Sequence, residues 1–234
     1  MSTGEERVTL RIQVRPSPET NDHEVLLFGD DQNLVERFGD KSIGLDPDEI
    51  LVKPCPLLLL GALLGADDCL IGRCDCGVIG CGDVRVQVSV AEELVRWVAV
   101  DGPREPVLFD LQAYTSEVLR ALNDHAWETP ERTASRLIRE AVDRELLHRL
   151  GFKLSWVSGR VDPHVMTVAL WLEPGPYQVL VRVPWIETDN PGVTADAVAN
   201  LLEQPPSCWS DVVWFPQGAT LGPPALAGAG WRRC

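Results

Sequence analysis

The segment Cys69–Val90, "CLIGRCDCGVIGCGDVRVQVSV", holds four of the seven cysteines of the chain and continues into its clearest strand pattern. Val84, Val86, Val88 and Val90 alternate with other residues, and a period of two is typical of a half-buried β-strand. The glycines between the cysteines favour a tight turn, because glycine tolerates backbone angles that other residues avoid. The segment therefore predicts a β-hairpin with cysteines near its tip.

On both sides of this hairpin, up to residue 108, the apolar residues mostly show the alternating spacing of strands. After residue 108 they follow the spacing of a helix. Asp110 is a suitable N-cap for a first helix, and Thr129 followed by Pro130 is typical of the start of a second, which we expect to run to Gly151. Strand patterns return after this glycine. This order predicts an α+β fold of mostly antiparallel strands with a central helix pair.

The same pattern suggests a division of the chain. We expect an N-terminal β-rich region with the cysteine hairpin (1–108), then the helix pair with further strands (109–216), which can also form one integrated domain with the first. The last segment (217–234) is rich in Gly, Ala and Pro, a composition typical of a disordered tail.

Composition and charge limit the partners of this chain of 234 residues. Its formal net charge is −14, so its long-range field repels phosphate backbones and anionic lipid heads. We therefore expect no nucleic-acid or membrane partner, and a basic protein as the favoured one. The N-terminus lacks a secretory signal, and the apolar run Pro56–Ala66 is too short to span a membrane. These features predict a cytoplasmic protein with reduced thiols.

The hairpin geometry predicts which cysteines meet. If the four residues between Cys76 and Cys81 form the loop, these two face each other across the strands and Cys74 faces Asp83. Cys69 then has the parity of the core side, unless a bulge shifts it. The candidate metal ligands are Cys69, Cys74, Cys76 and Cys81, of which a regular register brings three together.

Three interpretations of the cysteines stay open. A structural Zn²⁺ suits a cluster of thiolates in a reducing compartment, although the spacing C-x4-C-x-C-x4-C differs from the usual C-x2-C pairs. It also differs from the plant-type iron–sulfur pattern. Small, inert thiols can instead fill a tight turn, or Cys76 and Cys81 can form a redox pair.

Several sequence blocks occur in a recognisable order: "GRCDCGVIGCGDVRV", then "LVRWVAV", then "FDLQAYTSEVLRALNDHAWETPERTASRLI", and later "WVSG" and "DVVWF". This order resembles that of a set of bacterial hypothetical proteins sharing GRCxCGxxGCGD, FDxxxYxxEV and WETP blocks. The resemblance covers about Val25–Phe215. It implies one recurring architecture, and it implies neither an activity nor a catalytic residue.

The aromatic residues suggest a contact surface. The chain has eight tryptophans, a residue type enriched in binding hot spots. Trp185, Trp209 and Trp214 lie in or beside loop segments, where they can line a surface groove for a partner. Core packing is the alternative, since tryptophan is highly buried on average.

The sequence favours a binding protein over an enzyme. It contains no G-x-S-x-G, P-loop, G-x-G-x-x-G or H-E-x-x-H motif, and we assign no catalytic or cofactor-binding residue. His164 beside Asp162 is the best acid/base candidate. We therefore expect an acidic cytoplasmic interaction protein, of the inhibitor or immunity kind, whose cysteine hairpin binds structural zinc. A metal-dependent enzyme and a thiol redox sensor remain as alternatives.

Overall fold

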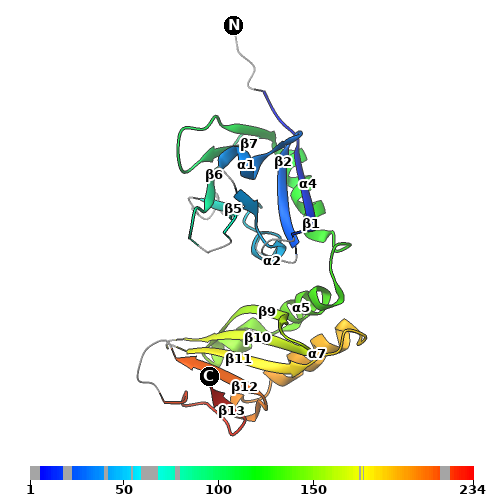
Figure 1. Cartoon of the computed structure of the whole chain (residues 1–234), viewed down its shortest axis with the longest axis vertical. Helices are drawn as coiled ribbons and strands as arrows, with labels where there is room; N and C mark the ends of the chain where they lie inside the picture. The colour runs from blue at the N-terminus through cyan, green and yellow to red at the C-terminus, as the bar shows by residue number, and fades with distance from the viewer. Residues whose placement is uncertain are drawn as a thin grey trace. The chain divides into compact units, whose positions relative to one another are not determined.

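The chain folds into two compact units of mixed helices and strands in the computed structural model. The units are Met1–Trp127 (unit 1) and Glu128–Cys234 (unit 2), and the strands are mostly antiparallel, which confirms the predicted α+β class (Figure 1). The division falls after Trp127 and not at the expected boundary after residue 108. The residues that the structure describes are 6–17, 23–39, 42–53, 55–58, 68–76, 80–173, 175, 177–216 and 222–234.

Unit 1 contains two sheets and three described helices. The three-stranded sheet has the order β1 (Leu10–Pro16), β2 (His23–Gly29) and β3 (Gln32–Asn33). The five-stranded sheet has the order β4 (Ser42–Gly44), β5 (Cys69–Cys74), β6 (Val84–Ala91), β7 (Leu94–Ala99) and β8 (Val107–Asp110). The helices are α1 (Leu34–Phe38), α2 (Pro47–Ile50) and α4 (Leu111–Asn123).

Isolated bridges join the two sheets at both ends of the five-stranded one. Arg7 pairs with Leu108 of β8, and Val25 of β2 pairs with Leu45, which follows β4. The strands therefore surround a single apolar core, to which β1, β2, β5, β6, β7 and α4 all contribute buried side chains. Burying this surface is the main favourable term in the stability of unit 1.

Helix α4 forms where the sequence predicts a helix. The Asp110 side chain accepts a hydrogen bond from Ala113 N at 2.9 Å, which satisfies an otherwise unpaired amide of the first turn. Tyr114 on its inner face is 1% exposed, packs edge-on against Trp97 of β7, and donates its hydroxyl to Leu57 O at 3.0 Å. The helix thus belongs to unit 1 because its apolar face completes that core.

The outer edge of β1 is occupied by side chains of α4. Ile12 N donates to Glu117 Oε1 at 2.7 Å, and Ile12 O accepts from Arg120 Nη2 at 2.7 Å. Arg120 Nε also donates to Glu117 Oε2 at 2.7 Å, so the pair stands where a neighbouring strand would. Burial raises the pKa of Glu117, but the hydrogen bonds from Arg120 and Ile12 outweigh it and the pKa is lowered.

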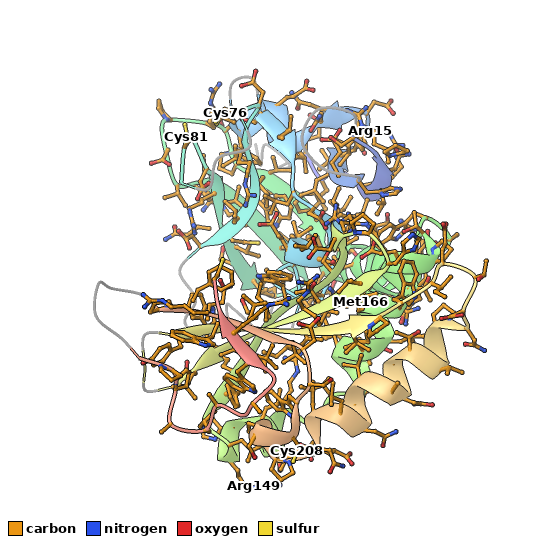
Figure 2. The ribbon with its side chains drawn as sticks, turned by 60° about the horizontal axis from the view of Figure 1, so that its bottom comes forward. Arg15, Cys76, Cys81, Arg149, Met166 and Cys208 are labelled. Carbon is orange, nitrogen blue, oxygen red and sulfur yellow. The ribbon has the colours of Figure 1, made fainter. Side chains whose placement is uncertain are left out.

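Unit 2 is a five-stranded sheet with helices packed on it. The strand order is β13 (Trp231–Arg233), β12 (Val212–Pro216), β11 (Tyr177–Pro184), β10 (Val165–Leu172) and β9 (Phe152–Asp162). The helices are α5 (Pro130–Ala141), α6 (Arg144–Arg149), α7 (Pro191–Leu202) and the 3₁₀-helix η1 (Pro206–Cys208). Met166 of β10 is fully buried and contacts Ser135 of α5 (Figure 2). None of the helices in the described residues has the length and apolar character needed to cross a membrane.

The second predicted helix is in fact two helices. Thr129 caps α5 as expected, accepting from Arg132 N at 3.3 Å. The helix ends at Ala141, and Asp143 then caps α6 by accepting from Glu145 N and Leu146 N, both at 2.9 Å. The aspartate competes for the backbone amides and starts a new helix, a preference typical of this side chain.

Of the tail expected to be disordered (217–234), residues 217–221 lie outside the described residues, while residues 222–234 are placed and include strand β13. Strand β13 pairs in parallel with β12, and Trp231 stacks on the buried Trp209 with ring centroids 6.0 Å apart. Trp231 Nε1 also donates to Pro206 O at 3.0 Å. A composition rich in Gly and Pro predicts disorder only on average, and one well-packed tryptophan is enough to overcome it here.

Replacing Trp231 by Ala should therefore lower the free energy of unfolding of unit 2 by about 2 kcal/mol, because the stacked ring and its hydrogen bond are both lost. Arg232→Ala is the matched control, since Arg232 only forms an exposed ion pair with Asp211. Denaturant unfolding followed by tryptophan fluorescence measures both variants. Equal stability of the two would contradict the proposed role of Trp231.

Candidate metal centre

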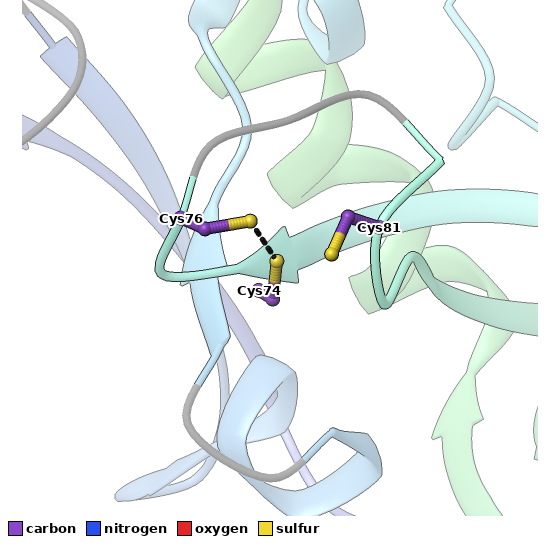
Figure 3. A group of neighbouring side chains, drawn as sticks. All are labelled: Cys74, Cys76 and Cys81. Carbon is purple, nitrogen blue, oxygen red and sulfur yellow. Dashed lines mark hydrogen bonds between the residues drawn. The ribbon is translucent and has the colours of Figure 1, made fainter.

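Three of the four predicted cysteine ligands come together beside the β5–β6 connection. Cys74 is the last residue of β5, while Cys76 and Cys81 lie in the segment that leads to β6. Their sulfur atoms point toward one another (Figure 3) and all lie within 4.8 Å of one another. Cys74 Sγ and Cys76 Sγ are hydrogen-bonded at 2.6 Å. These three thiols could hold one metal ion.

The register of β5 decides where Cys74 lies. The β5–β6 pairing contains an irregularity between Leu70 and Gly72, after which Gly72 pairs with Val84. The sequence-based register placed Cys74 opposite Asp83, but the observed ladder follows a different register on both sides of the irregularity, with Leu70 opposite Arg85 before it and Gly72 opposite Val84 after it. Cys76 and Cys81 consequently belong to the connecting segment and not to two facing strands.

Gly82 allows the close approach of the chain to Cys74. Its φ is +64°, and a Cβ atom built on it would lie 3.1 Å from Cys74 Cβ and 3.8 Å from Cys74 Sγ. Any other residue would be strained at this φ and would crowd the thiol. Gly80 has a similar φ of +78° but open space around it. The sequence indicated unusual backbone angles at these glycines, and the contact between Gly82 and Cys74 could be found only in the structure.

Cys69, the fourth predicted ligand, lies apart from this cluster. Its side chain is 5% exposed in the core of unit 1, where Cys69 pairs with Val86. Burial, and then the nearby Cys55 thiol and Asp68, raise the pKa of Cys69 to about 12. A thiol held protonated in an apolar core packs as a small hydrophobic residue. Cys69 is thus not one of the clustered thiols, although it was among the four candidate ligands; parity placed it on the core side only for a regular register, which the irregularity between Leu70 and Gly72 interrupts.

Asp83, another candidate ligand, has both carboxylate oxygens in use. Oδ1 accepts from Gly80 N at 3.3 Å, and Oδ2 forms an ion pair with Arg85 Nη2 at 3.4 Å. Arg85 also pairs with Asp68 at 3.1 Å. These contacts hold the turn that carries Cys81, so the role of Asp83 in this structure is to order the loop.

Contact with the other two thiols makes ionisation of Cys81 unfavourable. Hydrogen bonds with Cys76 and then Cys74, followed by the charges of these two groups, raise the pKa of Cys81 to about 11. Like charges so close together disfavour one another, and a cation between them reverses that balance. Cys81 is therefore a poor nucleophile without a metal, and the three sulfurs together supply ligand atoms for one.

The spacing of the sulfurs suits a thiolate metal centre. Zinc binds thiolate sulfur at about 2.3 Å in tetrahedral geometry, which puts two sulfurs about 3.8 Å apart. The three sulfurs here fall within 4.8 Å of one another, and the 2.6 Å between Cys74 and Cys76 would have to widen for both to bind one ion. Soft thiolates select zinc, Cu(I) or iron–sulfur clusters over hard cations such as Mg²⁺.

The three tryptophans predicted to contact a partner do not line a surface groove. Trp185, Trp209 and Trp214 are 7%, 0% and 4% exposed and belong to the core of unit 2. Trp209 packs against Phe152, and Trp214 against Tyr177. The prediction was wrong because Trp214 lies within β12, and Trp185 and Trp209, although they lie beside loops, are buried in the core.

The predicted acid/base candidates belong to unit 2 and not to the unit that carries the cysteine cluster. His164 occupies the turn between β9 and β10, with a φ of +59°, and Asp162 forms an ion pair with Arg182 at 3.0 Å. Within unit 1, a groove of about 690 Å³ lies beside β1 and α4, and no cysteine lines it. The groove and the cysteine cluster are therefore separate features of unit 1.

We expect the raised pKa of Cys81 to slow its reaction with iodoacetamide. In reduced, metal-free protein at pH 8, Cys81 should react about tenfold or more slowly than the same residue in denaturant, because only the thiolate attacks. The difference should disappear as the pH rises through 11, where the folded-state thiol ionises. Mass mapping of the labelled cysteines measures this, and equal rates in the folded and denatured chain at pH 8 would refute it.

Comparison with known proteins adds no assignment to this geometry. No protein-family model matches the chain, and no curated protein or solved structure matches it either. The three thiols near the β5–β6 connection are therefore the feature of the described residues from which we argue function.

Proposed function

We propose that Cys74, Cys76 and Cys81 bind one zinc ion, and that the protein is a non-enzymatic interaction protein whose cysteine hairpin the metal stabilises. The observation that carries this proposal is the convergence of three sulfur atoms within 4.8 Å. Structural metal sites contribute folding free energy directly, because the unfolded chain does not hold the ligands together. Here the ion would join the end of β5 to the segment before β6.

The surroundings of the cluster favour a structural role over a catalytic one. Cys76 and Cys81 are exposed and Cys74 is half-buried. Catalytic metals in enzymes commonly lie in a concave site that encloses the substrate and excludes water. A site at the exposed end of a hairpin offers little such enclosure, which supports the interaction protein over the metal-dependent enzyme.

A basic protein is the partner that the charge supports. The chain has 35 acidic and 21 basic residues, so complementary charge would accelerate its encounter with a basic surface. Trp185, Trp209 and Trp214 are buried, so they do not form the surface that would contact this partner. The expected location is the cytoplasm, where thiols stay reduced and free to bind metal.

Elemental analysis of the full chain, purified under reducing conditions without a metal-affinity tag, tests the zinc site. We expect about one zinc per chain, and Cys76→Ser or Cys81→Ser should abolish it. Cys69→Ser is the matched control. Because Cys69 lies in the core and outside the cluster, this variant should keep its zinc. Metal-free wild-type protein, or zinc retained in both cluster variants, would exclude the proposed site.

The two glycines of the turn provide a second test. Gly82→Ala should weaken zinc binding at least about tenfold, because its methyl group crowds Cys74 and adds backbone strain. Gly80→Ala adds similar strain at a similar φ but meets open space, so zinc affinity should change much less. Competition with a chromophoric chelator gives both affinities. Equal losses would show that backbone strain alone matters at this turn.

A further inference from the structure

If Cys74, Cys76 and Cys81 hold zinc as proposed, the fourth coordination position of the metal needs a ligand. All cysteines and histidines of the sequence lie in the residues that the structure describes. Besides the cluster, unit 1 contains Cys55, Cys69, His23 and His125 as possible sulfur or nitrogen ligands. A fourth ligand of these types from unit 1 would therefore have to be one of these four.

None of the four belongs to the cluster. Cys55 and Cys69 are 2% and 5% exposed within the core of unit 1. His23 is buried at the start of β2, with its ring 5.4 Å from that of Trp127. His125 follows α4. Among the described residues, the group that can share one metal contains Cys74, Cys76 and Cys81 and no further His, Cys, Asp or Glu.

Three thiolates leave one corner of a zinc tetrahedron open. Structural zinc is almost always four-coordinate, and sites with three protein ligands take an external molecule in the fourth position. Cys76 and Cys81 are exposed, so that corner is within reach of a large partner. An exposed open position suits a side chain presented by another macromolecule.

Charge decides which donor this position favours. Three thiolates and Zn²⁺ together carry one negative charge, and Asp75 lies between two of the ligands in sequence. The nearby Arg85 is paired with both Asp68 and Asp83. A carboxylate or a fourth thiolate would add negative charge to this surface, whereas a neutral imidazole would not.

We propose that the zinc centre has an exchangeable fourth position that binds a neutral nitrogen donor, a histidine imidazole of a partner protein. The metal then forms part of the interaction surface in addition to holding the hairpin. A basic partner with an accessible histidine combines this donor with the charge that the acidic chain favours.

The test uses the full chain loaded with Co²⁺, whose visible spectrum reports the ligands. Imidazole titrated at pH 7.5 should shift the d–d bands with saturation at one equivalent bound per Co²⁺. Acetate should bind at least about tenfold more weakly than imidazole, and 2-mercaptoethanol should add no further thiolate-to-cobalt charge transfer. Asp75→Asn should reduce the preference for imidazole over acetate, whereas Asp124→Asn, at the end of α4, should leave it unchanged.

The outcomes separate this inference from the proposed site. A chain that binds no Co²⁺ or Zn²⁺ refutes the metal site itself. A chain that binds Co²⁺ but responds to none of the three ligands has a metal whose coordination sphere is already filled. That result would refute the exchangeable fourth position and leave the metal site in place. Tighter binding of acetate, or a new thiolate band with 2-mercaptoethanol, refutes the neutral donor.

Discussion

The packing of Gly72 in the middle of unit 1 constrains the position of the whole cysteine segment. A Cβ atom at this residue would overlap the side chain of Val35 in α1 and would lie 2.8 Å from Ile43 O of β4. Only glycine lets β5 approach both elements so closely. The same residue follows the irregularity in the β5–β6 ladder and pairs with Val84, so the register that ends at Cys74 depends on it.

The proposed centre combines a rigid ligand with two from a turn. Cys74 is held in β5 between β4 and β6, whereas Cys76 and Cys81 come from the segment that joins the strands. A metal bound there would extend the order of the sheet into the turn. Two of the cysteines that would hold the ion are also exposed, so a partner could reach the bound metal.

Local signals predicted much of this structure, while long-range packing could not be read from the chain. The alternating valines predicted β6, and Asp110 and Thr129 marked the starts of α4 and α5. Of the four candidate ligands, Cys74, Cys76 and Cys81 come together, whereas Cys69 lies in the core. The burial of Trp209 and the order of the C-terminal strand depend on contacts between residues distant in sequence, such as the stacking of Trp209 on Trp231. Composition does not predict such contacts.

Glu117 and Arg120 form an ion pair and bind the backbone N–H and C=O of Ile12, and this arrangement affects solubility in acid. An unpaired strand edge is a template for cross-β association between copies, and here a carboxylate and a guanidinium occupy it. Because the pKa of Glu117 is lowered, this carboxylate stays charged to a lower pH than an ordinary glutamate does. The protection of Ile12 against fibril-like pairing is therefore electrostatic, and it is lost when acid protonates Glu117.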